Sequence, residues 1–486
     1  MTRLRTSALR WPRTGGGALA LLYVAIALTP LALATGRPVA PLEPWERFGA
    51  GLGLAPLTAM AMQFVTSGRF RSVSGGLGID KIMAFHKIAA WWVLGALLLH
   101  PFAYVLPTVL DDPDLGRRRL VAYLTLPQYR TGVVALVALA LLVAGSRLRE
   151  SLPLRYEAWR AFHVALAVTA AGAGLHHALT AGRFSALGPV EGWWWGVSGA
   201  LVAVMGTLYG WRWIRLHLRP WRLHAVTKLA DRTWELDIRP APGGRDLRYE
   251  AGQFLWMTEG ARRFPLFDHP FSIADSPMRP GLRLIVKEAG DFTDRIGALP
   301  PGAPIGVDGP HGEFSLENHA GDSVLLVAGG AGLGPIMGLL RDLAARKDPR
   351  PVRLAYAVAH PLDFACLEEI EAAMTVLSLR VLPVCETEVE GYAGAVGRLD
   401  RPLLDRLLEG LEPRDAVAMI CGPGPMVVAV SDALHEIGLP MERIVYERFD
   451  YASGAASRQD RRRLRRFLLV GAGLAAGVAL FAALPH

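Results

Sequence analysis

Long apolar runs dominate the first half of the chain, and their lengths predict helices that cross a membrane. A crossing helix needs about 20 mostly apolar residues. Six runs before residue 215 approach this length: 16–36, 46–66, 83–106, 131–146, 158–180 and 193–213. A seventh run, 467–484, follows the strongly basic stretch 461–466. We therefore expect an α-helical transmembrane bundle of six spans and an extra C-terminal transmembrane helix.

Residues 222–450 have the pattern of soluble domains instead. Up to residue 315, short runs such as Leu282–Lys287 alternate apolar and polar positions between Gly and Pro residues, which predicts an antiparallel β-barrel. Beyond residue 320, apolar strands such as Val352–Val358 alternate with helices, which predicts an α/β doubly wound parallel sheet. We expect a transmembrane domain, a β-barrel domain, a nucleotide-binding α/β domain, a basic linker and a C-terminal helix, over residues 1–218, 219–318, 319–451, 452–466 and 467–486.

Composition narrows the possible functions. The formal net charge is +8, but the Arg clusters flank apolar spans, which indicates membrane topology rather than nucleic-acid binding. The most basic loops fall on one side if every span crosses, so we expect the soluble domains on the cytoplasmic side. The loop with Asp111, Asp112, Asp114 and Arg117–Arg119 is expected outside. The three cysteines have no metal-ligand spacing, which argues against a disulfide framework and a zinc site.

Histidines inside the spans are the first candidate functional residues. His86 and His100 lie fourteen positions apart in the third run, and His163 and His177 lie fourteen apart in the fifth. Fourteen residues are close to four helical turns, so each pair projects from one face, roughly 21 Å apart. Imidazoles are haem-iron ligands. The spacing predicts two b-type haems, an inner one between His86 and His163 and an outer one between His100 and His177.

His176 competes with His177 for the outer iron. Thirteen positions swing His176 off the face of His163, unless Gly172 and Gly174 mark a bulge. We favour His177. Packing or interface histidines are the alternative to ligands, but matched depths on two spans favour ligation.

The segment after the expected strand Gly252–Met257 is a candidate FAD site. Phe271 can stack on a flavin ring, and Ser272 can hydrogen-bond its reactive edge. A glycine turn that opens a helix near Phe292 presents backbone N–H groups to a pyrophosphate. An ordinary barrel loop is the alternative. The candidate residues are His269, Pro270, Phe271, Ser272, Lys287, Gly290, Asp291 and Thr293.

A glycine-rich loop between an apolar strand and a helix is a candidate NAD(P)H site, because it lets the backbone approach phosphates. A second motif follows a buried strand farther on, at a strand end where open α/β sheets place ligands. A buried structural thiol is the alternative reading of Cys421. The residues are Gly329, Gly330, Gly332, Gly334 and Pro335 in the loop, and Cys421, Gly422 and Pro423 in the second motif.

Taken in order, the paired histidines, His-Pro-Phe-Ser, Gly-Asp-Phe-Thr, Gly-Gly-Ala-Gly-Leu-Gly-Pro and Cys-Gly-Pro-Gly-Pro-Met resemble the ferric reductase/NADPH oxidase superfamily, and its bacterial branch most. The resemblance covers about residues 46–451. It implies that His269 lies near the FAD phosphates, that Ser272 faces flavin N5, and that Lys287, Gly290 and Thr293 hold the pyrophosphate. It implies that Phe449 covers the flavin until nicotinamide displaces it. Phe449, Cys421 and Ser272 would then be catalytic, in a multi-pass protein of the bacterial inner membrane.

Three features depart from the family. A basic linker and an apolar span follow the terminal aromatic residue. Ala359, with His360 beside it, replaces the Arg that favours NADPH, which leaves NADH and NADPH open. Tyr104 stands where the superoxide-producing members place a further histidine.

We therefore expect electrons to pass from NAD(P)H through FAD and two haems to an outer acceptor. Ferric iron or a ferric chelate is the leading acceptor, oxygen the second and a partner protein the third. A haem-binding scaffold or sensor and a membrane-anchored flavin reductase are the alternative functions.

Overall fold

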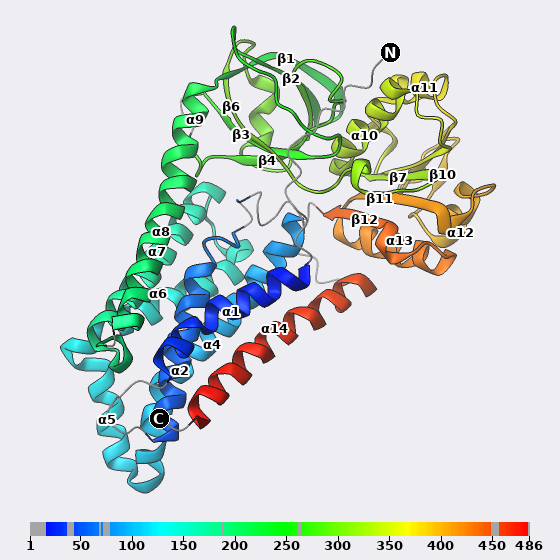
Figure 1. Ribbon diagram of the computed structural model, residues 1–486. Coiled ribbons are helices and arrows are strands. Elements are labelled where there is room, and N and C mark those ends of the chain that lie inside the picture. Colours follow the sequence, from blue (N-terminus) through cyan, green and yellow to red (C-terminus); the bar gives the residue numbers. More distant parts are fainter. Residues whose placement is uncertain are drawn as a thin grey trace, which may run out of the picture. The chain divides into compact units, whose positions relative to one another are not determined.

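The computed structural model describes residues 16–35, 43–67, 70, 78–186, 188–260, 264–448 and 456–484. The chain forms two compact units, which are described separately (Figure 1). Met1–Gly210 and Leu464–His486 make up the first unit, and Trp211–Arg463 make up the second.

The first unit is a bundle of helices around one apolar core. Its elements are α1 (Gly16–Ala34), α2 (Pro44–Met62), α4 (Ile79–Asp111), α5 (Pro113–Thr125), η1 (Pro127–Tyr129), α6 (Arg130–Arg147), η2 (Arg149–Ser151), α7 (Tyr156–Ala181), η3 (Arg183–Ala186), α8 (Gly188–Met205) and the π-helical turn η4 (Gly206–Trp211), joined by most of α14 (Arg458–Ala483). A helical membrane-like region is thus confirmed.

Fewer helices meet the length and hydropathy that a membrane crossing needs than the sequence predicts, within the described part of the chain. Five helical stretches are long and apolar enough to cross: Gly16–Ala34, Lys81–Asp111, Pro127–Arg147, Tyr156–Ala181 and Arg458–Ala483. The runs 46–66 and 193–213 form α2 and α8, which do not meet that criterion among the described residues. Most of α2 is buried within the bundle, so its side chains meet protein. Six spans therefore stay a prediction.

The loop expected between the third and fourth spans contains the helix α5. Asp112 caps its first turn, because Oδ1 accepts the N–H groups of Asp114 and Leu115 at 3.0 Å each. Pro113 fits the first helical position, where no N–H is needed.

Helix α14 begins inside the stretch expected to be a basic linker. Ser457 and Asp460 form a reciprocal cap: Ser457 Oγ accepts the Asp460 N–H at 3.1 Å, and Asp460 Oδ2 accepts the Ser457 N–H at 3.0 Å. Farther along, Gly471 leaves room for Trp92 and Gly477 leaves room for Leu28, which lets α14 pack closely against α4 and α1.

The second unit starts with the short helix α9 (Arg212–Leu218) and an antiparallel sheet of strand order β4-β3-β6-β1-β2-β5. The strands are β1 (Trp221–Ala230), β2 (Thr233–Pro240), β3 (Phe254–Glu259), β4 (His269–Ser272), β5 (Leu282–Lys287) and β6 (Pro304–His311). Only the isolated bridge between Ile273 and Leu284 connects the edges formed by β4 and β5 among the described residues. The antiparallel sheet is as expected, whereas its closure into a barrel stays a prediction.

A parallel sheet of order β10-β9-β8-β7-β11-β12 follows, with helices on both faces. Its strands are β7 (Ser323–Gly329), β8 (Val352–Val358), β9 (Leu379–Cys385), β10 (Ala395–Val396), β11 (Ala416–Gly422) and β12 (Ile444–Arg448). Its helices are α10 (Leu333–Arg346), α11 (Leu367–Met374), α12 (Arg401–Leu407) and α13 (Gly424–Ile437), with short 3₁₀ turns between elements. The strand order reverses between β7 and β11, whose carboxyl ends therefore form the expected ligand-binding edge.

A buried guanidinium joins the two sheets. Arg341 on α10 donates to Glu235 of β2 at 2.7 Å, to Glu369 of α11 at 2.5 Å and to the carbonyl of Ala274. Burial alone would lower the pKa of Arg341, but the two carboxylates raise it above its usual range. The ion pairs therefore fix the FAD-type sheet against the nucleotide-binding sheet.

Candidate functional site

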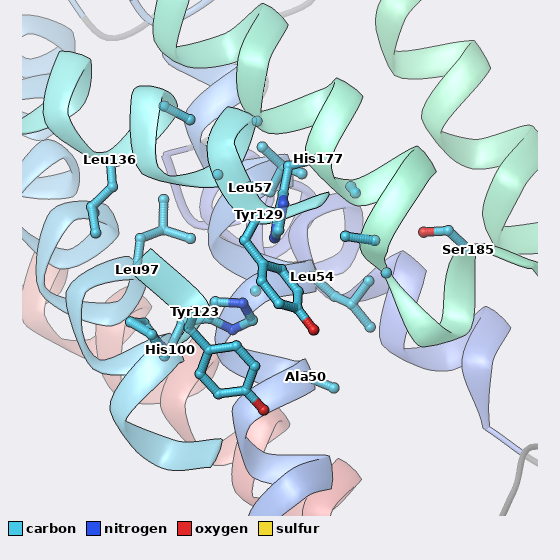
Figure 2. A pocket seen from close by; sticks show the side chains of 18 of the residues that line it. Ala50, Leu54, Leu57, Leu97, His100, Tyr123, Tyr129, Leu136, His177 and Ser185 are labelled. Carbon is cyan, nitrogen blue, oxygen red and sulfur yellow. The ribbon is translucent and has the colours of Figure 1, made fainter. Parts of the chain in front are cut away.

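Two histidines from different helices face one cavity in the helical unit (Figure 2). His100 comes from α4 and His177 from α7, and the cavity between them has a volume of about 230 Å³. We call it the outer cavity. Nδ1 of His100 donates to the carbonyl of Gly49 at 2.7 Å. Metal-binding histidines commonly make such a bond, because it fixes the tautomer that leaves Nε2 free for the metal.

Two glycines make room for these rings. A methyl group at Gly53 would lie 2.8 Å from Cε1 of His100, and one at Gly132 would lie 2.9 Å from Cε1 of His177. Nδ1 of His177 is buried and has no hydrogen-bond partner in the described part of the chain. Close glycines, a fixed His100 and an apolar cavity fit a haem held by two imidazoles.

His176 lies elsewhere on α7. Its Nδ1 interacts with the Thr131 hydroxyl at 3.3 Å, and it does not line the outer cavity. The reason is that α7 is one uninterrupted α-helix, so Gly172 and Gly174 introduce no bulge. The fourteen-residue spacing therefore keeps His163 and His177 on one face.

The inner pair is also close enough to interact electrostatically, His86 from α4 with His163 from α7. Nδ1 of His163 is 3.1 Å from the Ser146 hydroxyl. The described residues contain no cluster of three or more His, Cys, Asp or Glu side chains that could hold a metal ion. Two imidazoles on opposite faces of a porphyrin do not need such a cluster.

The FAD-type sheet places its expected residues on β4 and beside it. Ser272 is buried, and its Oγ has no hydrogen-bond partner among the described residues. The ring of His269 stacks on Phe292 with centroids 4.0 Å apart, and Phe271 lies 6.0 Å from the same ring. Pro270 pairs with Trp256 of β3. An unpartnered hydroxyl beside aromatic rings suits the edge of a flavin.

The expected pyrophosphate site differs from the sequence interpretation. The helix expected near Phe292 is only the six-residue 3₁₀ turn η5 (Thr293–Ala298). Thr293 Oγ1 accepts the Ala289 N–H at 2.7 Å and donates to the Gly290 carbonyl at 3.0 Å. The Gly290 N–H donates to Asp294, and Asp291 is exposed. These bonds occupy the N–H groups of Ala289 and Gly290, and the role of the turn in binding a pyrophosphate stays a prediction.

Lys287, three residues before Gly290, also lies beside the glycine-rich loop. Its Nζ is 3.6 Å from Asp363, and both side chains line a small hollow together with Gly330 and Ala331. A cation at the glycine-rich loop suits the phosphates of a nucleotide.

Four glycines allow close packing around the two nucleotide motifs. Gly332 packs on the backbone of Cys421 and Gly422, where a side chain would clash with the Cys421 carbonyl. Gly329 and Gly422 share the space beside Met426. Gly334, followed by Pro335 in the first turn of α10, lies beside Ser272. The expected flavin-edge hydroxyl and the expected nicotinamide loop are therefore neighbours.

Cys421 is fully buried at the end of β11, where it pairs with Glu447 of β12, and Pro423 caps the following helix α13. Phe449 lies outside the described residues. Burial raises the pKa of a different thiol, Cys366, to about 12.

The sequence interpretation missed one buried charge cluster. Asp308 of β6 lies 3.3 Å from Arg212 of α9 and 3.7 Å from His311. Burial alone would raise the pKa of Asp308, but a hydrogen bond with His311 and the charge of Arg212 hold it well below its usual range. Nothing in the sequence pairs residues so far apart, and Arg212 has there the pattern of a basic residue beside an apolar run.

Family models match three parts of the chain. They are a ferric reductase like transmembrane component over residues 52–174, an FAD-binding domain over 224–299 and an oxidoreductase NAD-binding domain over 326–432. The first model covers both histidine helices up to residue 174, and the other two cover the two sheets.

Three similar proteins each match less than half of the chain. A flavohemoprotein of Bordetella pertussis is 30% identical over 250 residues, which are 47% of this chain and 60% of that protein. A probable dihydroorotate dehydrogenase B electron transfer subunit of Methanothermobacter thermautotrophicus is 31% identical, over 40% of this chain and 67% of that protein. The crystal structure of the Amycolatopsis cytochrome P450 reductase GcoB matches 48% of this chain and 70% of its own, at 25% identity and a TM-score of 0.43.

Proposed function

We propose that this chain, which belongs to the ferric reductase/NADPH oxidase-type family with a ferredoxin reductase-like module, moves electrons from NAD(P)H through FAD and two b-type haems to an acceptor on the outer face of a membrane. It is an NAD(P)H-dependent oxidoreductase with a ferric reductase-like transmembrane region. The observation that carries the proposal is the outer cavity, where His100 and His177 face each other from two helices (Figure 2).

When bound, FAD would supply hydride-accepting chemistry and the haems would supply single-electron chemistry. The chain supplies positions. His86 and His163 would hold the inner iron and His100 and His177 the outer one. Gly49 fixes the tautomer of His100 through its carbonyl.

The residues around Ser272 and the glycine-rich loop would align nicotinamide with flavin. Ser272 would donate its hydroxyl to the flavin edge, and Gly334 beside it leaves space for a close approach of the two rings. Gly329, Gly330 and Gly332 would admit the nucleotide phosphates, with Lys287 as the nearby cation. Cys421 and Phe449 would shape the nicotinamide end, as in the family.

We place the domains over the ranges inferred from the sequence, with both sheets on the cytoplasmic side of a bacterial inner membrane. The basic segments that flank the spans support this orientation. Ferric iron or a ferric chelate is the proposed acceptor. Tyr104, one turn beyond His100, offers no second imidazole for oxygen chemistry.

The test is an anaerobic reduction of the purified chain in lipid nanodiscs by NADH or NADPH. We expect two haems per polypeptide. NADH or NADPH should reduce both haems at least as fast as the enzyme turns over, and a ferric chelate should then reoxidise them. His100→Ala should retain one haem and lose chelate reduction, whereas the control His176→Ala should behave as the unmodified chain. Full chelate reduction by His100→Ala would indicate an anchored flavin reductase. Haem that NAD(P)H never reduces would indicate a scaffold or sensor.

A further inference from the structure

The lining of the outer cavity is polar at one end only. Most of its wall consists of aliphatic side chains such as Leu54, Leu97 and Leu136. Apart from the two histidines, its hydrogen-bonding side chains are the indole of Trp194 and a group formed by three tyrosines and the turn η3: Tyr104, Tyr123, Tyr129, Arg183 and Ser185. The cavity therefore has one region that can receive a polar group of a ligand.

Ser185 is the strongest sign of a missing partner. Its residue is 3% exposed, and its Oγ has no hydrogen-bond partner among the described residues. Figure 2 shows the hydroxyl pointing from η3 toward the cavity. A buried hydroxyl without a partner costs about 1–3 kcal/mol of stability. A ligand that accepts a hydrogen bond from it would remove that cost.

The charges beside Ser185 favour an anion. Arg183 lies 3.5 Å from Glu46, and Arg119 lies 3.9 Å from the same carboxylate. Two guanidinium groups share one carboxylate, so one positive charge is left over. Arg183 is about half exposed, which makes it reachable from outside the cavity as well as from within.

The tyrosine rings complete this end of the wall. Their centroids are 6.4 Å apart between Tyr104 and Tyr123 and 5.0 Å apart between Tyr123 and Tyr129, and Tyr104 lies 5.4 Å from the ring of His100. Arg119 Nε donates to the Tyr123 hydroxyl at 3.3 Å, which fixes this ring at the cavity. Phenolic hydroxyls donate well to carboxylate oxygens.

We propose that Arg183 and Ser185, with the neighbouring tyrosine hydroxyls, bind a carboxylate at the polar end of the outer cavity. The inference rests on the proposed function, because it concerns the same cavity. The carboxylate has two possible sources: a propionate of the outer haem, or an arm of a polycarboxylate ferric chelate such as citrate. In the second case Fe³⁺ of the bound chelate takes one electron from NAD(P)H oxidation and becomes Fe²⁺, and no bond of the carboxylate breaks.

The experiment uses the full chain in nanodiscs with Arg183→Gln, Ser185→Ala and the charge-retaining Arg183→Lys. Arg118→Gln is the matched control, because Arg118 is exposed on α5 and lies outside the cavity lining. We measure haem content and the midpoint potential of each haem. We also measure KM and kcat for ferric citrate and for a neutral ferric hydroxamate. A neutral hydroxamate offers no carboxylate to the site.

If the chelate supplies the carboxylate, Arg183→Gln raises KM for ferric citrate roughly tenfold, equivalent to one lost charge-assisted hydrogen bond. KM for the hydroxamate and both potentials stay unchanged, and Arg183→Lys recovers most of the affinity. If a propionate supplies it, the midpoint potential of the outer haem falls, because loss of a positive charge disfavours the added electron. Both acceptors are then affected alike.

Variants at Arg183 and Ser185 that match Arg118→Gln in every reading would overturn this inference and leave the proposed function intact. Failure of NAD(P)H to reduce any haem in the unmodified chain would instead remove the proposed function, whatever these variants do.

Discussion

Adding one methyl group beside each outer histidine tests the ligand assignment directly. In Gly53→Ala the new Cβ would lie 2.8 Å from Cε1 of His100, and in Gly132→Ala it would lie 2.9 Å from Cε1 of His177. Ordinary contact starts at 3.4 Å, so each ring must move by about half an ångström. His100 cannot turn freely, because Nδ1 is bonded to the Gly49 carbonyl. Iron–imidazole geometry tolerates only about 0.2 Å.

We therefore expect both variants to hold the outer haem about 10–100-fold less tightly, the usual cost of disturbing the support of a metal ligand. Alanine is favoured over glycine in a helix by about 1 kcal/mol, so the loss should not come from unfolding. The assay is the ratio of haem to polypeptide and the low-spin haem spectrum of chains purified in lipid.

Matched controls lie on the same helices as the two histidines. Gly95 on α4 and Gly172 on α7 have open space where a Cβ would be, so alanine there should leave haem content unchanged. Two fully occupied haems with unaltered spectra in Gly53→Ala and Gly132→Ala would refute the assignment of His100 and His177.

Three further predictions concern the second unit. Gly332→Ala should abolish flavin reduction by NAD(P)H in stopped-flow absorbance while dithionite still reduces the flavin, because the new Cβ would clash with the adjacent strand end; a normal hydride-transfer rate would contradict this. Arg341→Met should lower the free energy of unfolding by about 1–3 kcal/mol, because it removes the Arg341 donor from the Ala274 carbonyl and leaves the partly buried Glu235 to the more distant Arg283 at 3.7 Å. A loss below about 1 kcal/mol in chemical denaturation would count against it. Asp308→Asn should destabilise the unit at neutral pH. Because the pKa of Asp308 is depressed in the folded protein, its carboxylate stabilises the fold fully above the unfolded-state pKa of about 3.9, and this stabilisation is lost as the pH falls below that value. The free energies of unfolding of Asp308→Asn and the unmodified chain should therefore become equal in acid. A difference that grows in acid would be inconsistent with the Arg212 ion pair.

The parts of the fold that depend on local patterns could be predicted from the sequence. Strands β5 and β8 have the expected bounds, because alternation and apolar runs are properties of neighbouring residues. The histidine spacing also predicted which rings share a face, because α7 is a regular helix. The choice between His176 and His177 needed the structure, since a bulge at Gly172 or Gly174 would have reversed it.

Features that depend on distant residues could not be predicted in this way. One local feature was missed as well: the helix expected near Phe292 is a 3₁₀ turn, in which Thr293 and Asp294 accept the N–H groups of Ala289 and Gly290. Asp308 gave no signal, because Arg212 lies almost a hundred positions earlier. Local side-chain hydrogen bonds to the backbone determine the conformation of such turns, and a hydropathy pattern contains no information about these bonds.

The arginine run 117–119 shows how a local anomaly can identify a site. Basic residues are uncommon on the side of a membrane protein that faces outward, so the run counted against the proposed topology. The structure gives two of these arginines partners: Arg117 pairs with Asp114, and Arg119 bonds with Thr108 and Tyr123 and lies near Glu46. Acidic neighbours contribute little to the positive-inside rule, so these partners do not change the topological signal of the run. The same partners place Arg119 beside the polar end of the outer cavity, where an excess positive charge has a chemical use. The proposed carboxylate site therefore gives Arg119 a chemical role that the charge rule does not, because Arg119 and Arg183 share the carboxylate of Glu46.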